Sequence, residues 1–242
     1  MKVYSHRRTL LPYLAKKLKA RKYLEIGVKG GKTFLPIKVW KKIAVDPDFR
    51  IKADYRRSQI FKWLPNLWAQ YHAMTSDDFF RDQAADVLKP ASLDLAFIDG
   101  LHTYEQTYID LINTLPYVKE NGVILLHDCS PKSTSAAYPA ESIDAAKAMN
   151  LPGWNGMWSG DVWKVIPRIQ MGHPELQVKV IDEDSGLGLV IKKPSQSELT
   201  ADYDAAQIDA WDYAHLDANR TELLNLCEAK DVDHWLSKHL QW

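Results

Sequence analysis

The amino-acid sequence predicts an α/β fold in which helices cover both faces of a mostly parallel sheet. Residues 94–131 contain two short apolar runs separated by a helical stretch, a pattern typical of parallel strands buried on both faces. The first run ends at Asp99, which His102 follows, and the second ends at His127 and Asp128. A right-handed crossover brings the carboxyl ends of neighbouring strands to one edge, where α/β sheets bind ligands. We therefore expect these four side chains to meet in one cleft.

A second observation concerns the last strands of the sheet. Apolar runs at 177–182 and 187–193 are joined by Glu183-Asp184-Ser185-Gly186, which predicts an antiparallel hairpin. An antiparallel strand that closes an otherwise parallel sheet distinguishes this fold from the fully parallel dinucleotide-binding fold. The hairpin is the best fold-level discriminator in the chain.

Length, charge and cysteine content limit the possible classes of protein. The chain has 242 residues and a formal net charge of zero, so we expect one large domain and no nucleic-acid partner. Cys129 and Cys227 are the only cysteines, which suits a reducing compartment. No run approaches the roughly 20 apolar residues that a transmembrane helix needs. The expectation is a cytoplasmic protein without a transmembrane segment.

The N-terminal segment, residues 1–22, is predicted to form a basic amphipathic helix. Leu11, Leu14 and Leu18 share one face, and the basic residues lie mostly elsewhere. We expect the apolar face to pack on the core. Docking of the basic face on a membrane surface or a polyanionic glycan is the alternative.

Residues 23–33 predict a strand, a glycine-rich turn and a helix that begins near Thr33. Glycines let the backbone approach a ligand closely, and the start of a helix supplies free N–H groups. Asp46 ends the next apolar run, about 20 residues beyond Glu25, the spacing at which a carboxylate accepts from both hydroxyls of a ribose. The pattern indicates a cofactor that contains adenosine.

The turn lacks the motifs of two common classes of nucleotide-binding site. The dinucleotide fingerprint requires glycines where this chain has Lys29 and Lys32, and the spacing of a P-loop is absent as well. A carboxylate at Glu25, inside the loop, suits a cationic ligand better than a diphosphate.

These residues carry a family resemblance. The pattern Glu25-x-Gly27-x-x-x-Gly31-x-Thr33 resembles the first motif of class I S-adenosylmethionine-dependent methyltransferases, with a spacing closest to the cation-dependent O-methyltransferase branch. Later stretches resemble a subfamily described only as a methyltransferase domain; they are 74–80, 97–105, 127–128, 160–164 and 184–188. The resemblance covers roughly residues 20–193 in order.

The resemblance implies a Rossmann-like, three-layer sandwich with a seven-stranded sheet and a bound S-adenosylmethionine. It places the methionine part of the cofactor near the first motif, the ribose at Asp46, the adenine between Ser76 and Asp77, and the sulfonium beside Asp99. The implied cofactor-binding residues are Glu25, Gly27, Gly31, Thr33, Asp46, Ser76, Asp77 and Asp99.

For the chemistry, the resemblance implies a divalent metal, such as Mg²⁺, bound at Asp99 and Asp128. One expected oxygen ligand is replaced by His127, and imidazole suits softer metals than Mg²⁺, so the need for a metal stays open. His102 is a suitable general base near neutral pH, although loop histidines often only cap a helix. The predicted catalytic residues are Asp99, His102 and His127.

The remaining expectations concern domain organisation and function. Residues 23–193 form the cofactor-binding domain, with residues 131–160 as a lid or acceptor wall, and residues 194–242 form a helical C-terminal extension that packs on the sheet or mediates a homo-oligomer. The resemblance implies O-methylation of a sugar or other small-molecule hydroxyl, in surface-polysaccharide or natural-product biosynthesis. The alternative is a catalytically degenerate domain that binds a partner in a glycan-assembly complex.

Overall fold

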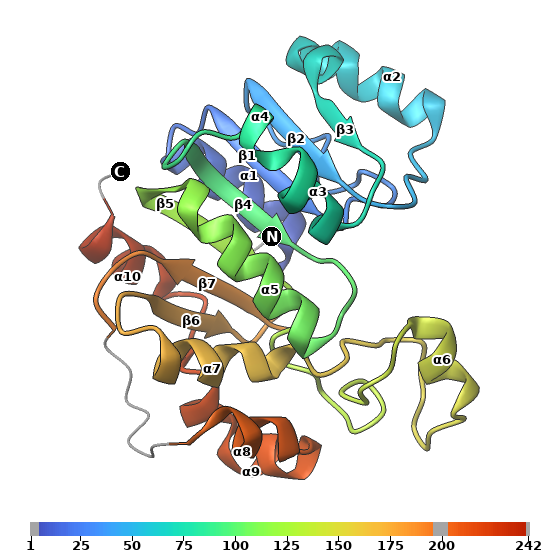
Figure 1. The fold of residues 1–242 in the computed structure, drawn as a ribbon, viewed down its shortest axis with the longest axis vertical. Coiled ribbons are helices and arrows are strands. Elements are labelled where there is room, and N and C mark those ends of the chain that lie inside the picture. The colour runs from blue at the N-terminus through green and yellow to red at the C-terminus, as the bar shows by residue number, and fades with distance from the viewer. Residues whose placement is uncertain (1–4, 196–202, 241–242) are drawn as a thin grey trace.

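A computed structural model describes residues 5–195 and 203–240, which form a three-layer α/β/α sandwich around one mixed sheet (Figure 1). The strand order is β3-β2-β1-β4-β5-β7-β6-β8, and β1 to β5 run parallel while β7 is antiparallel to both of its neighbours. The strands are β1 (Lys22–Ile26), β2 (Lys41–Val45), β3 (Gln70–His72), β4 (Leu93–Ile98), β5 (Val118–Leu126), β6 (Gln177–Ile181), β7 (Leu187–Ile191) and β8 (Leu226–Cys227).

This sheet confirms the predicted fold class and the closing hairpin of β6 and β7, but the expected number of seven strands was wrong. The eighth strand, β8, comes from the C-terminal extension and pairs parallel with β6, with Val180 opposite Leu226. A strand of two residues is too short to produce an alternating pattern, so the sequence carried no signal for it.

Helices cover both faces of the sheet. They are α1 (Arg7–Lys17), α2 (Ala53–Lys62), α3 (Ser76–Asp82), α4 (Ala84–Val87), α5 (Tyr104–Thr114), α6 (Ile143–Ala148), α7 (Val165–Gly172), α8 (Ala205–Ala210), α9 (Tyr213–Leu223) and α10 (Val232–His239), with 3₁₀ turns η2 (Leu64–Trp68), η3 (Leu115–Tyr117) and η4 (Val162–Lys164). Successive strand side chains point to opposite faces. In β4, Ala96 and Ile98 pack in the cluster that includes residues of α7, whereas Leu95 and Phe97 pack in the cluster with α1 and α10 (Figure 1).

Helix α1 packs on the core, as its apolar face predicts. Leu10, Leu11 and Leu14 are fully buried and belong to the same cluster as the strands. The extension packs on the sheet as well: Leu216 of α9 lies on one face and Leu236 of α10 on the other. Contact with a second copy through these helices stays a prediction, and residues 196–202 and 241–242 of the extension lie outside the described residues. None of the described helices is long and apolar enough to cross a membrane.

The helix expected to begin near Thr33 does not form. The chain makes consecutive turns there before β2. Pro36 has no N–H with which to continue a helical hydrogen-bond ladder. The buried amine of Lys42 then holds the turns in place by donating to the carbonyl oxygens of Phe34, Leu35 and Ile37. The glycine-rich turn therefore lacks the helix N-terminus that the sequence indicated.

Candidate active site

The carboxyl ends of β1, β2, β4 and β5 open on a cavity of about 930 Å³. This is the edge at which parallel α/β sheets bind ligands. Most of the site residues predicted from the sequence line the cavity, namely Gly27, Thr33, Asp46, Ser76, Asp77, Asp99, His102 and His127. Glu25, Gly31 and Asp128 lie behind its wall, so they act on the cavity through their neighbours.

Gly27 allows two loops to meet at the floor of the cavity. Its φ is +84°, and a Cβ atom there would lie 1.8 Å from the carbonyl oxygen of Asp99. No side chain fits in that space. Glycine therefore lets the turn after β1 contact the turn after β4, and it brings both to one site.

Asp46 presents a fixed carboxylate to the cavity. Its two oxygens accept hydrogen bonds from the backbone N–H groups of Lys29 and Asp48, each at 2.7 Å. Each carboxylate oxygen has a further lone pair, so the group can still accept from the hydroxyls of a ribose. The far end of the cavity is polar too: the Gln106 amide donates to Ser76 Oγ at 3.3 Å and to Asp77 Oδ1 at 3.0 Å.

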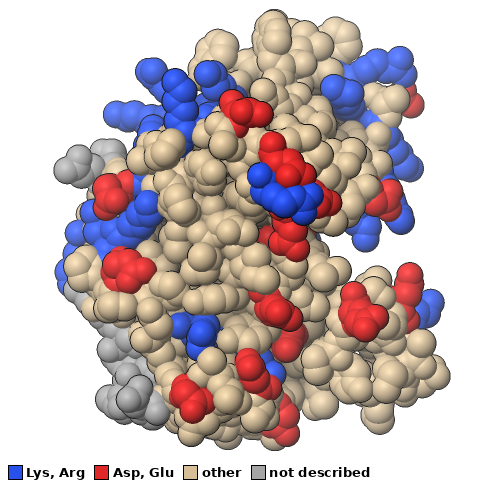
Figure 2. Space-filling model, in the orientation of Figure 1, with Lys and Arg blue, Asp and Glu red and all other residues tan. Residues whose placement is uncertain are grey.

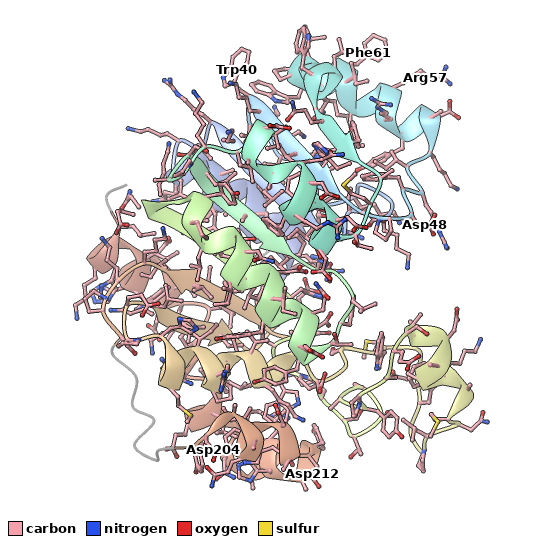
Figure 3. The ribbon with its side chains drawn as sticks, in the orientation of Figure 1. Trp40, Asp48, Arg57, Phe61, Asp204 and Asp212 are labelled. Atoms are coloured by element: carbon pink, nitrogen blue, oxygen red, sulfur yellow. The ribbon has the colours of Figure 1, made fainter. Side chains whose placement is uncertain are left out.

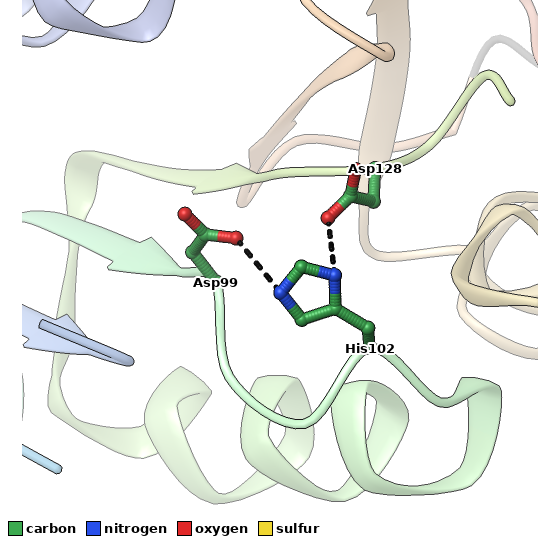
Figure 4. A group of neighbouring side chains, drawn as sticks. All are labelled: Asp99, His102 and Asp128. Carbon is green, nitrogen blue, oxygen red and sulfur yellow. Dashed lines mark ion pairs between the residues drawn. The ribbon is translucent and has the colours of Figure 1, made fainter. Parts of the chain in front are cut away.

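The imidazole of His102 lies between two carboxylates (Figure 4). Its Nδ1 is 2.8 Å from Asp128 Oδ2, and its Nε2 is 3.5 Å from Asp99 Oδ1. Burial by itself would lower the pKa of His102, but the attraction of Asp128 and Asp99 outweighs it and raises that pKa. Both His102 and Asp128 have a φ of +63°, in the left-handed region that few non-glycine residues adopt.

His127 is held between the same carboxylates and Arg7 of α1. Its Nδ1 lies 3.1 Å from Asp99 Oδ1 and 2.9 Å from Asp128 Oδ2, while its Nε2 lies 2.7 Å from Arg7 Nη1. The carboxylates favour a second proton on the ring and Arg7 opposes it. A guanidinium stays charged and only donates, so Nε2 must offer its lone pair and Nδ1 carries the proton. A doubly protonated His127 requires Arg7 to move.

Comparison with known proteins shows what the central part of the chain is similar to. Residues 24–129 match the family model described as a methyltransferase domain. That match includes both the glycine-rich turn and the His127-Asp128 pair. No match is found among curated proteins.

Several solved structures share the fold of this protein. An O-methyltransferase of tomaymycin synthesis from Streptomyces achromogenes, solved with SAM, is 15% identical with a TM-score of 0.50, over 76% of this chain and 78% of that chain. A methyltransferase from Podospora anserina bound to SAH is 14% identical with a TM-score of 0.51, over 77% and 78% of the two chains. An O-methyltransferase from Bacillus cereus in complex with SAH is 14% identical with a TM-score of 0.50, over 76% and 79%.

The cluster at the cavity contains two residues that were not among the predicted site residues. Arg7 Nη1 donates to Asp184 Oδ1 at 2.8 Å, the Arg7 backbone N–H donates to Asp184 Oδ2 at 2.8 Å, and Arg7 Nε lies 3.6 Å from Asp99 Oδ2. Arg7 was assigned to the solvated face of a basic helix, and Asp184 to a hairpin turn. A weak signal existed for Asp184, because it stands at the carboxyl-edge end of the closing hairpin.

The insertion at residues 131–160 reaches the candidate active site. The Trp158 ring stacks on His102 with centroids 5.6 Å apart and planes 7° from parallel. Gly160 lies against the backbone of His102, and a Cβ atom at Gly160 would be 1.9 Å from the carbonyl oxygen of His102. Ser142 and Ile143 of the insertion line the cavity as well. Its role as a lid or acceptor wall stays a prediction, and this placement is consistent with it.

The residues of the cluster fit a divalent cation by their donor atoms. One atom each from Asp99, His102 and Asp128 lies within 4.8 Å of the others. The predicted metal ligands Asp99 and Asp128 thus lie together with His102. His127 presents Nδ1 to the same two carboxylates and Nε2 to Arg7. Two carboxylates and an imidazole suit Mn²⁺, Fe²⁺ or Zn²⁺ better than Mg²⁺.

Glu25 lies under the cavity and has no exposed surface. Its carboxyl group accepts from the Tyr23 hydroxyl at 2.5 Å and from the Thr33 hydroxyl. Burial raises the pKa of Glu25 to about 8 despite these hydrogen bonds. Glu25 itself does not line the cavity, whereas Thr33, which donates to it, does.

This buried carboxyl predicts a pH dependence of stability. Between its ordinary pKa of 4.5 and its folded value of about 8, the folded state keeps the proton that the unfolded state has lost. Stability contributed by Glu25 is complete below pH 4.5 and is lost as the pH rises through about 8, with a slope of at most about 1.4 kcal/mol per pH unit. We expect urea unfolding of Glu25→Gln to lack this slope, so that wild type weakens relative to the variant from pH 5 to pH 8. Parallel pH profiles of the two proteins would contradict the assignment.

Proposed function

We propose that this protein transfers the methyl group of S-adenosylmethionine to a hydroxyl oxygen of a small molecule, with a sugar as the first acceptor class to test. The observation that carries the proposal is the placement of the Asp128–His102 pair beside the cavity that Gly27 and Asp46 line. A base held by a carboxylate is what an alcohol acceptor requires, because its oxygen must lose a proton as it is methylated.

The reaction follows from this geometry. The acceptor oxygen attacks the methyl carbon, the carbon–sulfur bond breaks, S-adenosylhomocysteine leaves, and the hydroxyl proton goes to Nε2 of His102. Asp128 accepts from Nδ1 and so keeps Nε2 free to act as the base. Asp99, 3.5 Å from Nε2, stabilises the imidazolium that forms, and its negative charge suits a position beside the sulfonium.

The proposal extends to a divalent cation at the same three side chains. Asp99, His102 and Asp128 would hold it, and when bound it would lower the pKa of an acceptor hydroxyl. His102 would then serve as a ligand. Turnover before and after chelation, with Mg²⁺ and Mn²⁺ added back, separates this arrangement from one in which His102 is the base.

The acceptor side of the cavity supports a compact polar or aromatic substrate. Leu101, Ser142, Ile143 and Trp158 bound it, so that apolar and hydroxyl groups face the same space. Such a wall fits the polyhydroxylated ring of a sugar or a phenolic natural product. We propose that the reaction takes place in the cytoplasm. Surface-polysaccharide and natural-product biosynthesis are the settings in which acceptors should be sought.

The first experiment is calorimetric titration with S-adenosylhomocysteine, with NAD as the control ligand. We expect wild type to bind S-adenosylhomocysteine alone, and Asp46→Ala to bind it roughly 10- to 100-fold more weakly, because a carboxylate acceptor to the ribose is lost. Asp86→Ala, which removes an exposed acid from α4, is the matched control and should bind normally.

Two outcomes would count against the proposal. Unchanged affinity in Asp46→Ala would remove the ribose role of this residue. No binding of S-adenosylhomocysteine by wild type would favour the alternative of a non-catalytic domain that binds a partner.

A further inference from the structure

Five large apolar side chains protrude from one end of the molecule. We call this group the aromatic cap; its members, with their exposed fractions, are Phe61 (86%), Trp68 (69%), Trp40 (63%), Leu64 (59%) and Leu67 (53%). Single exposed apolar residues are ordinary on protein surfaces, but a contiguous group of this size marks an interaction site. The active site does not use these residues, since none of them lines its cavity.

The members of the cap come from two neighbouring parts of the chain. Leu64 and Leu67 share one face of the 3₁₀ turn η2, and Phe61 lies in the last turn of α2, from which extended Trp63 leads into η2. Trp40, which precedes β2, joins them because its ring lies 5.6 Å from that of Trp63. Trp40 and Phe61 both point outward from the same end of the molecule (Figure 3).

Positive charge surrounds the cap. Exposed cations of the segments that carry the cap are Lys38, Lys41 and Lys62, and Arg56 and Arg57 lie about one turn before Phe61 in α2. Residues 49–70 contain one acidic residue, Asp54, which pairs with Arg57. Figure 2 shows groups of Lys and Arg on both flanks of an uncharged end. The net charge of the whole chain is zero, so this positive charge is a local property of the cap.

A second group of cations continues from the cap along the amino edge of the sheet. Lys22 begins β1 and Lys41 begins β2. Burial lowers the pKa of Lys22, and repulsion from Lys41, Lys89 and Lys119 lowers it further. Asp94 pairs with Lys119 and offsets part of this charge.

We propose that the aromatic cap docks the protein on the surface of an anionic phospholipid membrane. Trp, Phe and Leu side chains that protrude among lysines and arginines are the combination by which peripheral proteins enter the interfacial layer of a bilayer. The cations supply attraction to anionic headgroups, and the apolar tips supply burial below them. The charge complementarity favours lipid over a second copy, because a cap that meets its own copy would bring these cations together.

The orientation of the cap separates docking from catalysis. Trp40 and Trp68 lie just before the amino ends of β2 and β3, whereas the cavity lies at the carboxyl ends of the strands. A molecule docked through the cap keeps its cavity away from the bilayer and open to a dissolved acceptor. Loss of docking should therefore leave binding of S-adenosylhomocysteine intact. The membrane proposal and the proposed function can thus fail independently, and the two measurements distinguish these failures.

The test is co-sedimentation of the full chain with phosphatidylcholine vesicles, with and without phosphatidylserine, at low and high salt. We expect binding to the anionic vesicles that weakens with salt. Phe61→Ser/Trp68→Ser should weaken it by on the order of tenfold or more. Lys41→Glu/Lys62→Glu should weaken it by roughly fivefold for each cation removed. Lys147→Glu/Met149→Ser makes the same kinds of change on α6 and its C-terminal end, away from the cap, and should bind as wild type does.

Circular dichroism and titration with S-adenosylhomocysteine confirm that the variants are folded. Wild type that fails to sediment with anionic vesicles overturns the proposal, and so does binding that neither cap variant changes. Dimerisation in analytical ultracentrifugation that Phe61→Ser/Trp68→Ser abolishes, without lipid binding, also overturns it and assigns the cap to contact between copies of the chain.

Discussion

Replacing His102 with alanine should lower kcat by roughly 100- to 10,000-fold, the contribution of a positioned general base. His102 is the side chain whose Nε2 can accept the proton of an acceptor hydroxyl, since Asp128 engages Nδ1 at 2.8 Å. Affinity for S-adenosylhomocysteine should change far less, because the cofactor contacts we assign to Asp46, Ser76 and Asp77 remain. Single-turnover methyl transfer and calorimetry measure the two effects separately.

The pH profile provides a readout that a purely structural role would not move. The base must be unprotonated, and Asp128 and Asp99 raise the pKa of His102 above its ordinary 6.5, so turnover should rise with pH through a value above 6.5. Asp128→Asn removes one of the two raising charges and should shift this rise to lower pH. A His102→Ala variant with wild-type turnover, or an Asp128→Asn profile with an unmoved rise, would exclude His102 as the base.

Replacing Gly27 with alanine adds one methyl group, and we expect this to be the most damaging glycine-to-alanine substitution in the site. The new Cβ would lie 1.8 Å from the Asp99 carbonyl oxygen, and the Asp99 N–H is held by the Ile26 carbonyl at 2.9 Å, so the two strand ends cannot separate freely. We expect a loss of more than about 4 kcal/mol in the free energy of unfolding, or, if the chain still folds, loss of S-adenosylhomocysteine binding.

Gly30→Ala is the matched control for this substitution. A Cβ atom at Gly30 meets no atom within 4 Å, although Gly30 lies in the same turn and also lines the cavity. Urea unfolding of this variant should differ from wild type by less than about 1 kcal/mol. Equal stability of both variants would show that the contact between the two turns is less tight than the structure indicates.

The central part of the fold could be predicted because its signals are local. The apolar runs that became β4 and β5 end at Asp99 and His127, and parallel pairing through α5 then brings those residues to one edge. The closing hairpin was equally clear, since a turn-forming segment joins two apolar runs. The same reasoning put Asp46 at the end of β2, on the cavity.

The parts that could not be predicted depend on contacts between distant segments. Arg7 lies on a basic helix whose sequence gives no sign that one arginine turns inward to meet Asp99 and His127. The helix expected after the glycine-rich turn was replaced by turns that the Lys42 amine holds, and this amine comes from the following strand. Nothing in the sequence indicated that Glu25 is fully buried, so that it lies beneath the cavity rather than on its wall.

The bond between Arg7 and Asp184 joins residues 177 positions apart. During synthesis, the cofactor turn, the two histidines and Asp99 emerge from the ribosome well before the hairpin turn that carries Asp184. Until then, Arg7 has no carboxylate on that side to hold it against His127. The cluster in its final arrangement therefore cannot form until the closing hairpin has been translated.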